Sequence, residues 1–241
     1  RPEFIPALVA PIVEGRTKFE DSYDVGPRTA AAMPATLNLV SYSDTSKAVT
    51  VRIAGSAATR EGLSWRTYRE ATMQVPRDRI ARLHMPIQWL CKGQAESANT
   101  RDSPLEKQRA KSTCDAGYAC RAGRCEKATI KESSLPDYTA EEVFGGGTTP
   151  DEGSCFDTLG CMAQGRTAAP DDDCRIPKPE EKRINVALRV LNDGICDTGG
   201  LKCYVPLDRD DKEGWRVAGD QLQLPPAVCD KLREGLVRAV L

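Results

Sequence analysis

Ten cysteines constrain this 241-residue chain more than any other feature of its sequence. Their number is even, the first ninety residues contain none, and no pair has the C-x-x-C spacing typical of zinc sites. His84 is the only histidine, so the second common zinc ligand is nearly absent. We therefore expect all ten cysteines to form disulfides, and the spacing alone leaves their connectivity open. They are Cys91, Cys114, Cys120, Cys125, Cys155, Cys161, Cys174, Cys196, Cys203 and Cys229.

Disulfides persist in oxidising compartments, which predicts an extracellular or cell-envelope location, at the periplasm or the outer-membrane surface. No apolar run approaches the roughly 20 residues that cross a bilayer, so we expect no transmembrane segment in this chain. The chain begins at Arg1, and we expect a mature or excerpted chain whose export signal was removed. The net charge is −1, with both signs mixed along the chain, so binding to nucleic acid or to an anionic membrane surface is not expected.

Apolar residues alternate with polar ones in several short runs of the first ninety residues. Successive side chains of a strand point to opposite faces, so each run predicts a half-buried strand. With turns expected at Gly55–Ser56 and at Pro76–Asp78, these runs predict an antiparallel β-sandwich over residues 1–92. The alternating apolar sets are Val49, Val51 and Ile53; Ala71, Met73 and Val75; and Leu83, Met85, Ile87 and Trp89.

The remaining chain divides by composition into three segments. Residues 93–144 form a polar excursion and a small cysteine-rich segment, with short helices expected to begin at Ser103 and Thr139. Residues 145–153 form a Gly/Pro linker, and residues 154–241 form a second, disulfide-stapled, β-rich domain with short helices. Four cysteines precede the linker and six follow it, which predicts that no bridge crosses it. The fold class is thus mostly β.

Local patterns place four elements in the second domain. Alternation predicts a strand over residues 184–190, with Ala187 on the face away from the core. The glycines between Cys196 and Cys203 predict a bridged hairpin, and Gly235 closes a helix predicted over Ala227–Glu234. The apolar end at residues 236–241 predicts a final strand.

Several short motifs resemble secreted surface modules of myxobacteria and related predatory bacteria. They include the spacing from Cys114 to Cys125, Leu135-Pro-Asp-Tyr138, and Leu224-Pro-Pro-Ala-Val-Cys229. The resemblance implies an envelope location, often as a lipoprotein, and a modular context beside further domains. It implies no catalytic residue.

No catalytic site or cofactor is predicted. Hydrolases commonly use a histidine as base or metal ligand, and His84 lies on the polar side of its alternating run. The turn containing Asp208, Asp210 and Asp211 offers carboxylates at the initial spacing of a calcium loop. Lys212 and Glu213 then interrupt that pattern, so we expect solvated turn charges, with calcium as the alternative.

Tyr118 and Trp215 are the predicted contact residues, because Tyr118 sits within the cysteine-rich loop and Trp215 follows an acidic turn and Gly214. The leading functional hypothesis is a non-enzymatic module whose partner is another envelope or extracellular protein. The alternatives are a carbohydrate- or glycan-binding module and the accessory region of a larger secreted enzyme.

Overall fold

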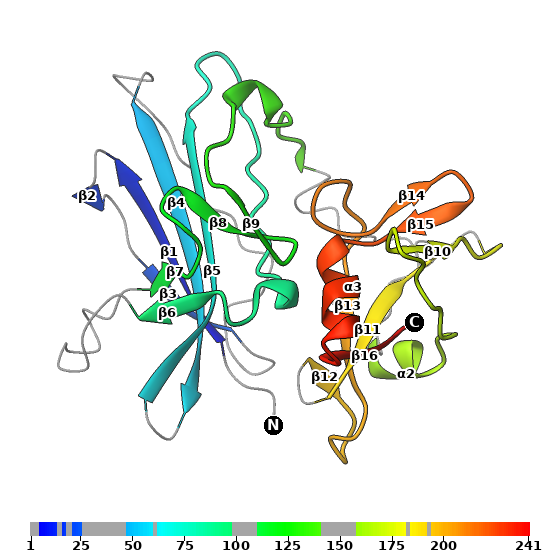
Figure 1. The fold of residues 1–241 in the computed structure, drawn as a ribbon. Coiled ribbons are helices and arrows are strands. Elements are labelled where there is room, and N and C mark those ends of the chain that lie inside the picture. The colour runs from blue at the N-terminus through cyan, green and yellow to red at the C-terminus, as the bar shows by residue number, and fades with distance from the viewer. Residues whose placement is uncertain are drawn as a thin grey trace. The chain divides into compact units, whose positions relative to one another are not determined.

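The computed structural model describes residues 5–13, 16–17, 21–25, 47–59, 62–97, 110–140, 158–181, 184–191 and 194–241. The chain divides into two compact units, unit 1 over Arg1–Gly145 and unit 2 over Gly146–Leu241 (Figure 1). Every described pair of neighbouring strands in a sheet is antiparallel, and strands far outnumber helices in both units. The mostly β prediction is confirmed.

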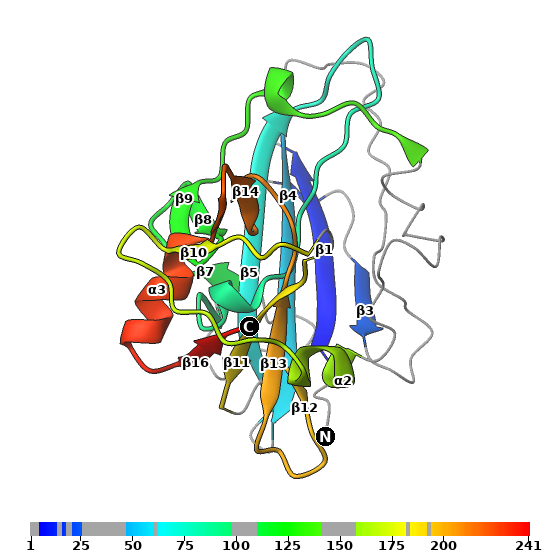
Figure 2. The same ribbon diagram turned by 90° about the vertical axis from the view of Figure 1, so that its right-hand side faces the viewer.

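Unit 1 is organised around a five-stranded sheet in the order β2-β1-β4-β5, with β3 pairing with β1. The strands β1, β4 and β5 run side by side along it (Figure 2). The other strands described in this unit form only two-stranded sheets, β6–β7 and β8–β9, so no second sheet of sandwich size is described there. The strands are β1 (Ile5–Val13), β2 (Arg16–Thr17), β3 (Asp21–Val25), β4 (Ala48–Thr59), β5 (Gly62–Gln74), β6 (Ala95–Ser97), β7 (Ala110–Ser112), β8 (Tyr118–Arg121) and β9 (Arg124–Lys127).

The hairpin β4–β5 supplies the core of unit 1 through the predicted alternation. Val51 on β4 and Met73 on β5 are buried against Leu135, which lies just after the short 3-10 helix η3 (Glu132–Ser134). Removing this apolar surface from water stabilises the unit by roughly 25 cal/mol per Å². Partly buried side chains complete the cluster, namely Val49, Ala81, Leu83, Met85 and Ile130.

The turn predicted at Gly55–Ser56 is wrong. Strand β4 continues through these residues to Thr59, and its register with β5 shifts between Gly55 and Ser56. A glycine inside a strand is typical of such a β-bulge, because the bulged residue needs backbone freedom. The same glycine therefore bends a strand here instead of ending it.

The strand predicted over residues 83–89 is also wrong. This segment belongs to no ladder of the described structure, and only Ala81 nearby forms an isolated bridge, with Asp137. Pro86 lacks an N–H to donate, which disfavours a ladder in the middle of the segment. Trp89 instead opens the 3-10 helix η1 (Trp89–Cys91).

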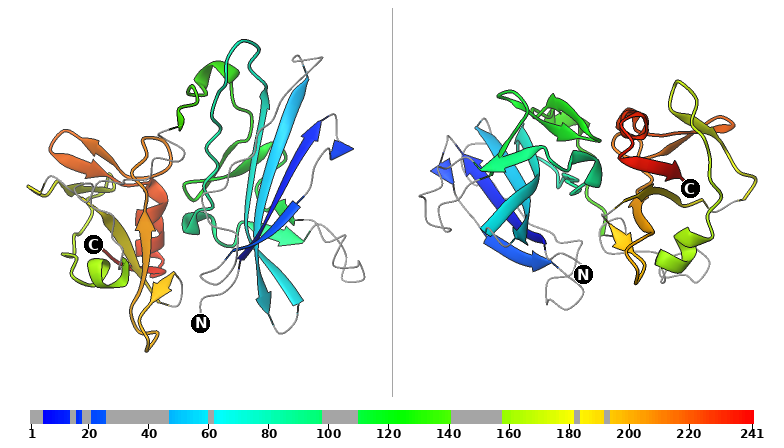
Figure 3. Two further views of the ribbon diagram at one scale, coloured as in Figure 1. Left: turned by 180° about the vertical axis from the view of Figure 1, so that it is seen from behind. Right: turned by 60° about the horizontal axis from the view of Figure 1, so that its bottom comes forward.

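The cysteine-rich segment is an integral part of unit 1. Thr72 on β5 donates its N–H to Ala128 O (2.9 Å) and accepts from the N–H of Ile130 (2.8 Å). The β8–β9 hairpin therefore adjoins β5 (Figure 3). The helix expected from Ser103 lies outside the described residues, as does the helix expected from Thr139 beyond Ala140.

The described residues of unit 2 form a four-stranded sheet, a three-stranded sheet and two helices. The larger sheet has the order β12-β13-β11-β16, and the smaller one has the order β10-β15-β14. Their elements are α2 (Thr158–Ala163), β10 (Arg175–Pro177), β11 (Val186–Val190), β12 (Ile195–Cys196), β13 (Cys203–Leu207), β14 (Arg216–Ala218), β15 (Gln221–Gln223), α3 (Pro226–Arg233) and β16 (Val237–Val240).

The burial of Ala187 on β11 corrects the sequence prediction for this residue. Val186 and Leu188 are buried as expected, but Ala187 is buried too. It packs with Met162 of α2 and Tyr204 of β13. The helix α2 therefore covers Ala187 on the face that alternation assigned to solvent, while Arg189 on the same face is exposed.

Helix α3 ends as the sequence predicts. Gly235 has φ +73° and donates to Leu232 O (3.1 Å), while Leu236 donates to Lys231 O (2.9 Å). This pair of bonds is a Schellman motif, in which a left-handed glycine satisfies the last carbonyls of the helix. The chain then reverses directly into the predicted final strand, β16.

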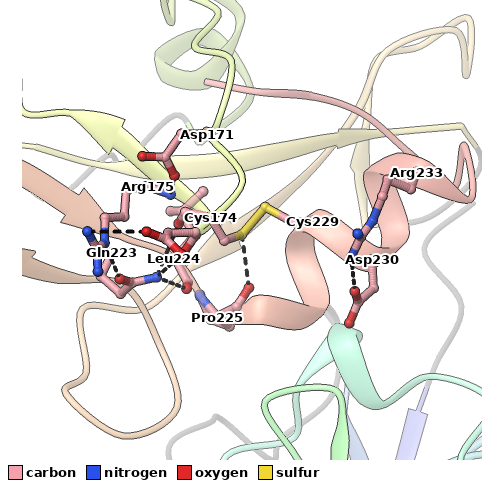
Figure 4. The surroundings of a disulfide bond; sticks show 10 residues. Asp171, Cys174, Arg175, Gln223, Leu224, Pro225, Cys229, Asp230 and Arg233 are labelled. Atoms are coloured by element: carbon pink, nitrogen blue, oxygen red, sulfur yellow. Dashed lines mark hydrogen bonds and ion pairs between the residues drawn. A yellow bond between two sulfur atoms is a disulfide. The ribbon is translucent and has the colours of Figure 1, made fainter.

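A disulfide from Cys174 to Cys229 fastens α3 to the turn before β10 (Figure 4). Gln223 on β15 supports the same turn, because its amide donates to Asp173 O (2.9 Å) and its Oε1 accepts from Arg175 Nε (3.0 Å). The first carboxylate of the acidic run at 171–173 is also occupied, since Asp171 Oδ1 accepts from the Arg175 N–H (2.8 Å). This acidic run is a folded turn.

Each described disulfide lies within one unit. The bridges are Cys91–Cys120 and Cys114–Cys125 in unit 1, and Cys174–Cys229 and Cys196–Cys203 in unit 2. Cys161 is disulfide-bonded as well, and no described cysteine is a free thiol. The predicted bridged hairpin is confirmed, because Cys196 on β12 lies directly opposite Cys203 on β13. Within the described residues, no helix is long and apolar enough to cross a membrane.

Candidate functional site

Trp215, a predicted contact residue, is a core residue instead. Only 4% of its surface is exposed, and its indole N–H donates to Leu207 O (3.0 Å). The guanidinium of Arg209 lies over its ring, 5.8 Å from the centroid. A glycine and several charges before it suggested exposure, but those charges belong to a turn that folds over the indole.

The turn at residues 208–215 is held by its own hydrogen bonds. Asp210 Oδ1 accepts from the N–H groups of Lys212 (2.8 Å) and Glu213 (2.7 Å), while the Trp215 N–H donates to Asp208 O (3.0 Å). A Cβ on Gly214 would lie 2.0 Å from Asp208 O, so the turn closes only around a glycine.

The calcium alternative at this turn gains no support. Because Asp210 Oδ1 already accepts two backbone N–H groups, it is a turn cap. Nowhere in the described part of the chain do three or more His, Cys, Asp or Glu side chains gather closely enough to hold a metal. Asp208, Asp210 and Asp211 thus remain a turn in which backbone contacts dominate.

Tyr118, the other predicted contact residue, is at the surface. It begins β8, opposite Lys127 of β9, and 38% of its surface is exposed. The Cys91–Cys120 and Cys114–Cys125 bridges hold its hairpin on both sides. Its position is compatible with a contact role.

A more exposed apolar site, which no sequence pattern predicted, lies elsewhere in unit 1. Ile80 is 75% exposed and Tyr138 is 39% exposed. The Tyr138 N–H donates to Ile80 O (2.9 Å), so two segments that are distant in the sequence present these side chains next to each other. We call this the Ile80–Tyr138 platform, comprising residues 79–82 and 135–138.

Arg79 holds the platform together. Its Nη1 donates to Leu135 O (2.9 Å) and to Asp137 Oδ1 (2.6 Å), and its Nη2 donates to Glu132 O (2.6 Å). Arg82 adds a backbone bond to Pro136 O (2.9 Å). One guanidinium therefore satisfies three acceptors on the opposite segment, which limits how far the two segments can separate.

The sequence signal for this platform is faint. Ile80 follows a charged turn and belongs to no alternating run, while Tyr138 follows a Pro-Asp pair typical of turns. The only local indication of exposure is a large apolar residue that lies among residues typical of turns. The pairing of the two segments depends on a contact across the fold, which no local pattern reports.

In unit 2, Leu201 is the most exposed large apolar residue described, at 85%. It lies in the β12–β13 hairpin loop, where its N–H donates to Asp197 Oδ1 (2.9 Å). Gly199 and Gly200 precede it, and within the described residues no second exposed apolar side chain is paired with it by a backbone bond. It is a single exposed leucine, which is common on protein surfaces.

His84 lines a small pocket of unit 1, together with Arg69 and Glu70 of β5. Glu70 Oε2 accepts from Arg52 Nε (2.6 Å) and from the Tyr68 hydroxyl (2.7 Å). Burial raises the pKa of Tyr68 above its ordinary value, and the hydrogen bond to Glu70 raises it further.

The pocket around His84 is lined mainly by charged and apolar side chains. Its described lining contains no serine, threonine or cysteine that could act as a nucleophile, and His84 itself is exposed.

A scan against protein-family models, a search of curated proteins and a search of solved structures each find no match to the chain.

Proposed function

We propose that this chain is a non-enzymatic module that binds another extracellular or cell-envelope protein through the Ile80–Tyr138 platform. The four described disulfides indicate an oxidising, non-cytoplasmic location, which supports such a setting. The observation that carries the proposal is the pairing of two exposed large apolar side chains on a backbone that Arg79 holds in place.

Physical chemistry favours this site for protein contact. Tyrosine is enriched among the residues that dominate binding energy, and an apolar neighbour extends the area removed from water. Because the platform is already ordered, binding to it loses less conformational entropy than binding to a mobile loop. The charges of Arg79 and Asp137 lie beside the apolar pair and supply a polar rim.

The test uses the full chain as bait against the extracellular and envelope proteins of its own cells. Ile80→Ser and Tyr138→Ser should each weaken capture of a specific partner by about thirtyfold, equivalent to about 2 kcal/mol at a central contact. Leu201→Ser removes a similarly exposed apolar residue of unit 2 and is the matched control. Equal capture by all three variants would refute the platform as the binding surface.

A glycan-binding role is the second candidate, and the exposed rings of Tyr118 and Tyr138 favour it. Aromatic faces can stack on sugars, but the two rings belong to different segments and Trp215 is held in the core. A glycan array read with wild type and Tyr118→Ala separates the two proposals. Glycan binding that depends on Tyr118 would replace protein contact as the leading function.

We also propose that this chain has no catalytic activity of its own. A panel of ester, peptide and glycoside substrates should show no turnover, because general acid–base chemistry needs a positioned partner group. Turnover that disappears in His84→Ala or Asp208→Asn would overturn it. A role as an accessory region of a larger secreted enzyme stays a prediction about sequence beyond this chain.

A further inference from the structure

The Cys196–Cys203 bridge differs from the other described disulfides in its backbone setting. Its two cysteines lie directly opposite each other on the antiparallel strands β12 and β13, and their Cα atoms are 4.0 Å apart. The Cα separations of the other described bridges are 5.7 Å, 5.7 Å and 5.8 Å. Most disulfides span about 5.5–6 Å between Cα atoms, and spans below about 4.4 Å are unusual. The backbone therefore holds this bridge at an unfavourably short span.

The hairpin itself sets this short span. The Asp197 N–H donates to Lys202 O (3.0 Å), so the next pair along the ladder, Cys196 and Cys203, is a non-hydrogen-bonded pair. The Cα atoms of such pairs lie only about 4.5 Å apart in antiparallel sheets. The Gly200 N–H donates to Asp197 O (3.0 Å) and tightens the loop further. The strands keep the spacing of the ladder, and the bridge must adapt to it.

A reductant can reach this bridge from the side of Cys196. Cys196 is half-buried, whereas Cys203 is fully buried. Thiol–disulfide exchange begins when a thiolate attacks one sulfur and the other sulfur leaves, so the accessible Cys196 Sγ is the point of attack. Cys196 Sγ lies 3.9 Å from Gly194 O, and Cys203 Sγ lies 3.9 Å from Gly200 O. Each thiol formed by reduction therefore has a carbonyl acceptor beside it.

We propose that Cys196–Cys203 is a thiol–disulfide exchange site, which a dithiol reductant opens while the other described bridges stay closed. One thiolate of the reductant attacks Cys196 Sγ, and the bond to Cys203 breaks, so that the Cys203 thiolate leaves and takes up a proton. The second thiolate of the reductant then attacks the sulfur of the first, and Cys196 leaves as a thiolate that is protonated in turn. The chain gains two electrons and two protons, and the reductant becomes a disulfide.

Opening the bridge loosens the hairpin between β12 and β13. Strand β12 has only two residues, so the bridge is a large share of what joins it to β13. Two separate thiols cannot approach as closely as the ~2.05 Å of a disulfide, so reduction pushes the two strands apart. The loop that moves carries Leu201, which is 85% exposed. None of these residues belongs to the Ile80–Tyr138 platform, so the exchange is independent of the proposed protein contact.

The test equilibrates the native full chain in buffers with rising ratios of reduced to oxidised dithiothreitol. Free thiols are trapped with iodoacetamide, and peptide mapping identifies the cysteines that carry the label. Cys196 and Cys203 should become labelled at a ratio at least about tenfold lower than the cysteines of any other described bridge, which corresponds to about 30 mV for a two-electron couple.

Cys114–Cys125 is the matched internal control. It is also a short bridge, with a sequence separation of 11 against 7, and Cys125 is exposed, whereas Cys196 is only half-buried. If exposure alone governed reduction, Cys114–Cys125 would open first, whereas the span set by the ladder predicts the opposite order. Reduction of Cys114–Cys125 first, or of both bridges at the same ratio, would overturn the proposal.

A variant tests the structural consequence separately. Cys196→Ser/Cys203→Ser mimics the opened bridge, and circular dichroism checks that it is folded. Amide hydrogen exchange at residues 195–204 should become at least about tenfold faster than in the oxidised wild type, while helix α3 keeps its protection. Unchanged exchange at residues 195–204 would show that the bridge does not hold the hairpin, and would overturn its role as a switch.

Discussion

Single residues of this chain often take their roles from backbone geometry that their type alone does not reveal. Gly214 shows this most directly, because its α-hydrogen faces the carbonyl of Asp208 at a distance that excludes any side chain. The glycine allows the acidic turn to close, and closing the turn buries Trp215. A residue predicted as a contact is thus part of the core because of the residue before it.

Gly214→Ala should destabilise unit 2 by about 1–3 kcal/mol or more, since the new methyl group overpacks the turn. The urea midpoint measures the loss, and the indole fluorescence of Trp215 should report looser packing. Gly199→Ala is the control, because its nearest heavy atoms lie at 3.8 Å, an ordinary contact distance. If both variants lose the same stability, the close approach at Asp208 is not a constraint.

Tyr68 predicts a specific alkaline sensitivity. Its folded-state pKa is raised by burial and by Glu70, so the folded protein keeps the phenolic proton above pH ~10, where an unfolded tyrosine loses it. The folded state then binds more protons than the unfolded state, and stability must fall as pH rises.

The contribution of Tyr68 is fully present below pH ~10 and declines above it by up to about 1.4 kcal/mol per pH unit. Tyr68→Phe should remove that part of the slope above pH ~10 in urea unfolding curves. Tyr118→Phe, at an exposed tyrosine, is the control variant. Identical slopes for wild type and Tyr68→Phe would show that Tyr68 ionises alike in both states.

At the scale of elements, bridges stabilise more when they close a longer stretch of chain. Cys174–Cys229 closes a separation of 55 residues, whereas Cys196–Cys203 closes one of 7 within a hairpin. If the stabilisation comes from loop entropy, these bridges are worth about 4 and about 2.5 kcal/mol. The longer bridge also ties α3 to the turn before β10, two elements that are distant in sequence (Figure 4).

Replacing both cysteines of Cys174–Cys229 by alanine should therefore cost unit 2 about 1.5–2 kcal/mol more than the same change at Cys196–Cys203. Denaturant unfolding of the two double variants makes the comparison within one unit. Equal losses in the free energy of unfolding would mean that the reduced, unfolded chain is already compact around these cysteines. Loop length would then not affect the stabilisation.

At the scale of the whole molecule, each described bridge lies within a single unit. Thermal unfolding should consequently respond unit by unit. Calorimetry should show one transition for each unit. Replacing Cys91 and Cys120 by alanine should lower the midpoint of the unit 1 transition and leave the midpoint of the unit 2 transition unchanged. A single transition that shifts as a whole would show that the two units unfold cooperatively.

A titration of thiols tests the same framework chemically. The denatured, unreduced chain should contain no reactive thiol, because no described cysteine is free and an even count allows complete pairing. Peptide mapping should recover Cys91–Cys120 and Cys114–Cys125 without any partner from unit 2. Two or more reactive thiols would contradict the oxidising location.

Local chemistry accounts for the features that could be predicted from the sequence. The Schellman end of α3 needs only Gly235 and its neighbours, and the hairpin between Cys196 and Cys203 needs only a short loop with glycines. The alternation in β4 and β5 reports one buried face within a single strand. Each of these signals is complete within a short stretch of sequence.

The tertiary structure decided the features that depend on distant partners. Ala187 is buried because α2 covers it, and Trp215 is buried because a turn folds over it. Residues 83–89 pair with no described strand, since Pro86 interrupts the donors that a neighbouring strand would need. The Ile80–Tyr138 platform exists because Arg79 reaches a segment that is distant in the sequence. Burial, pairing and exposure at these positions depend on tertiary contacts between segments that are distant in the sequence. Hydrophobic alternation and helix-cap motifs are local, so they carry no information about those contacts.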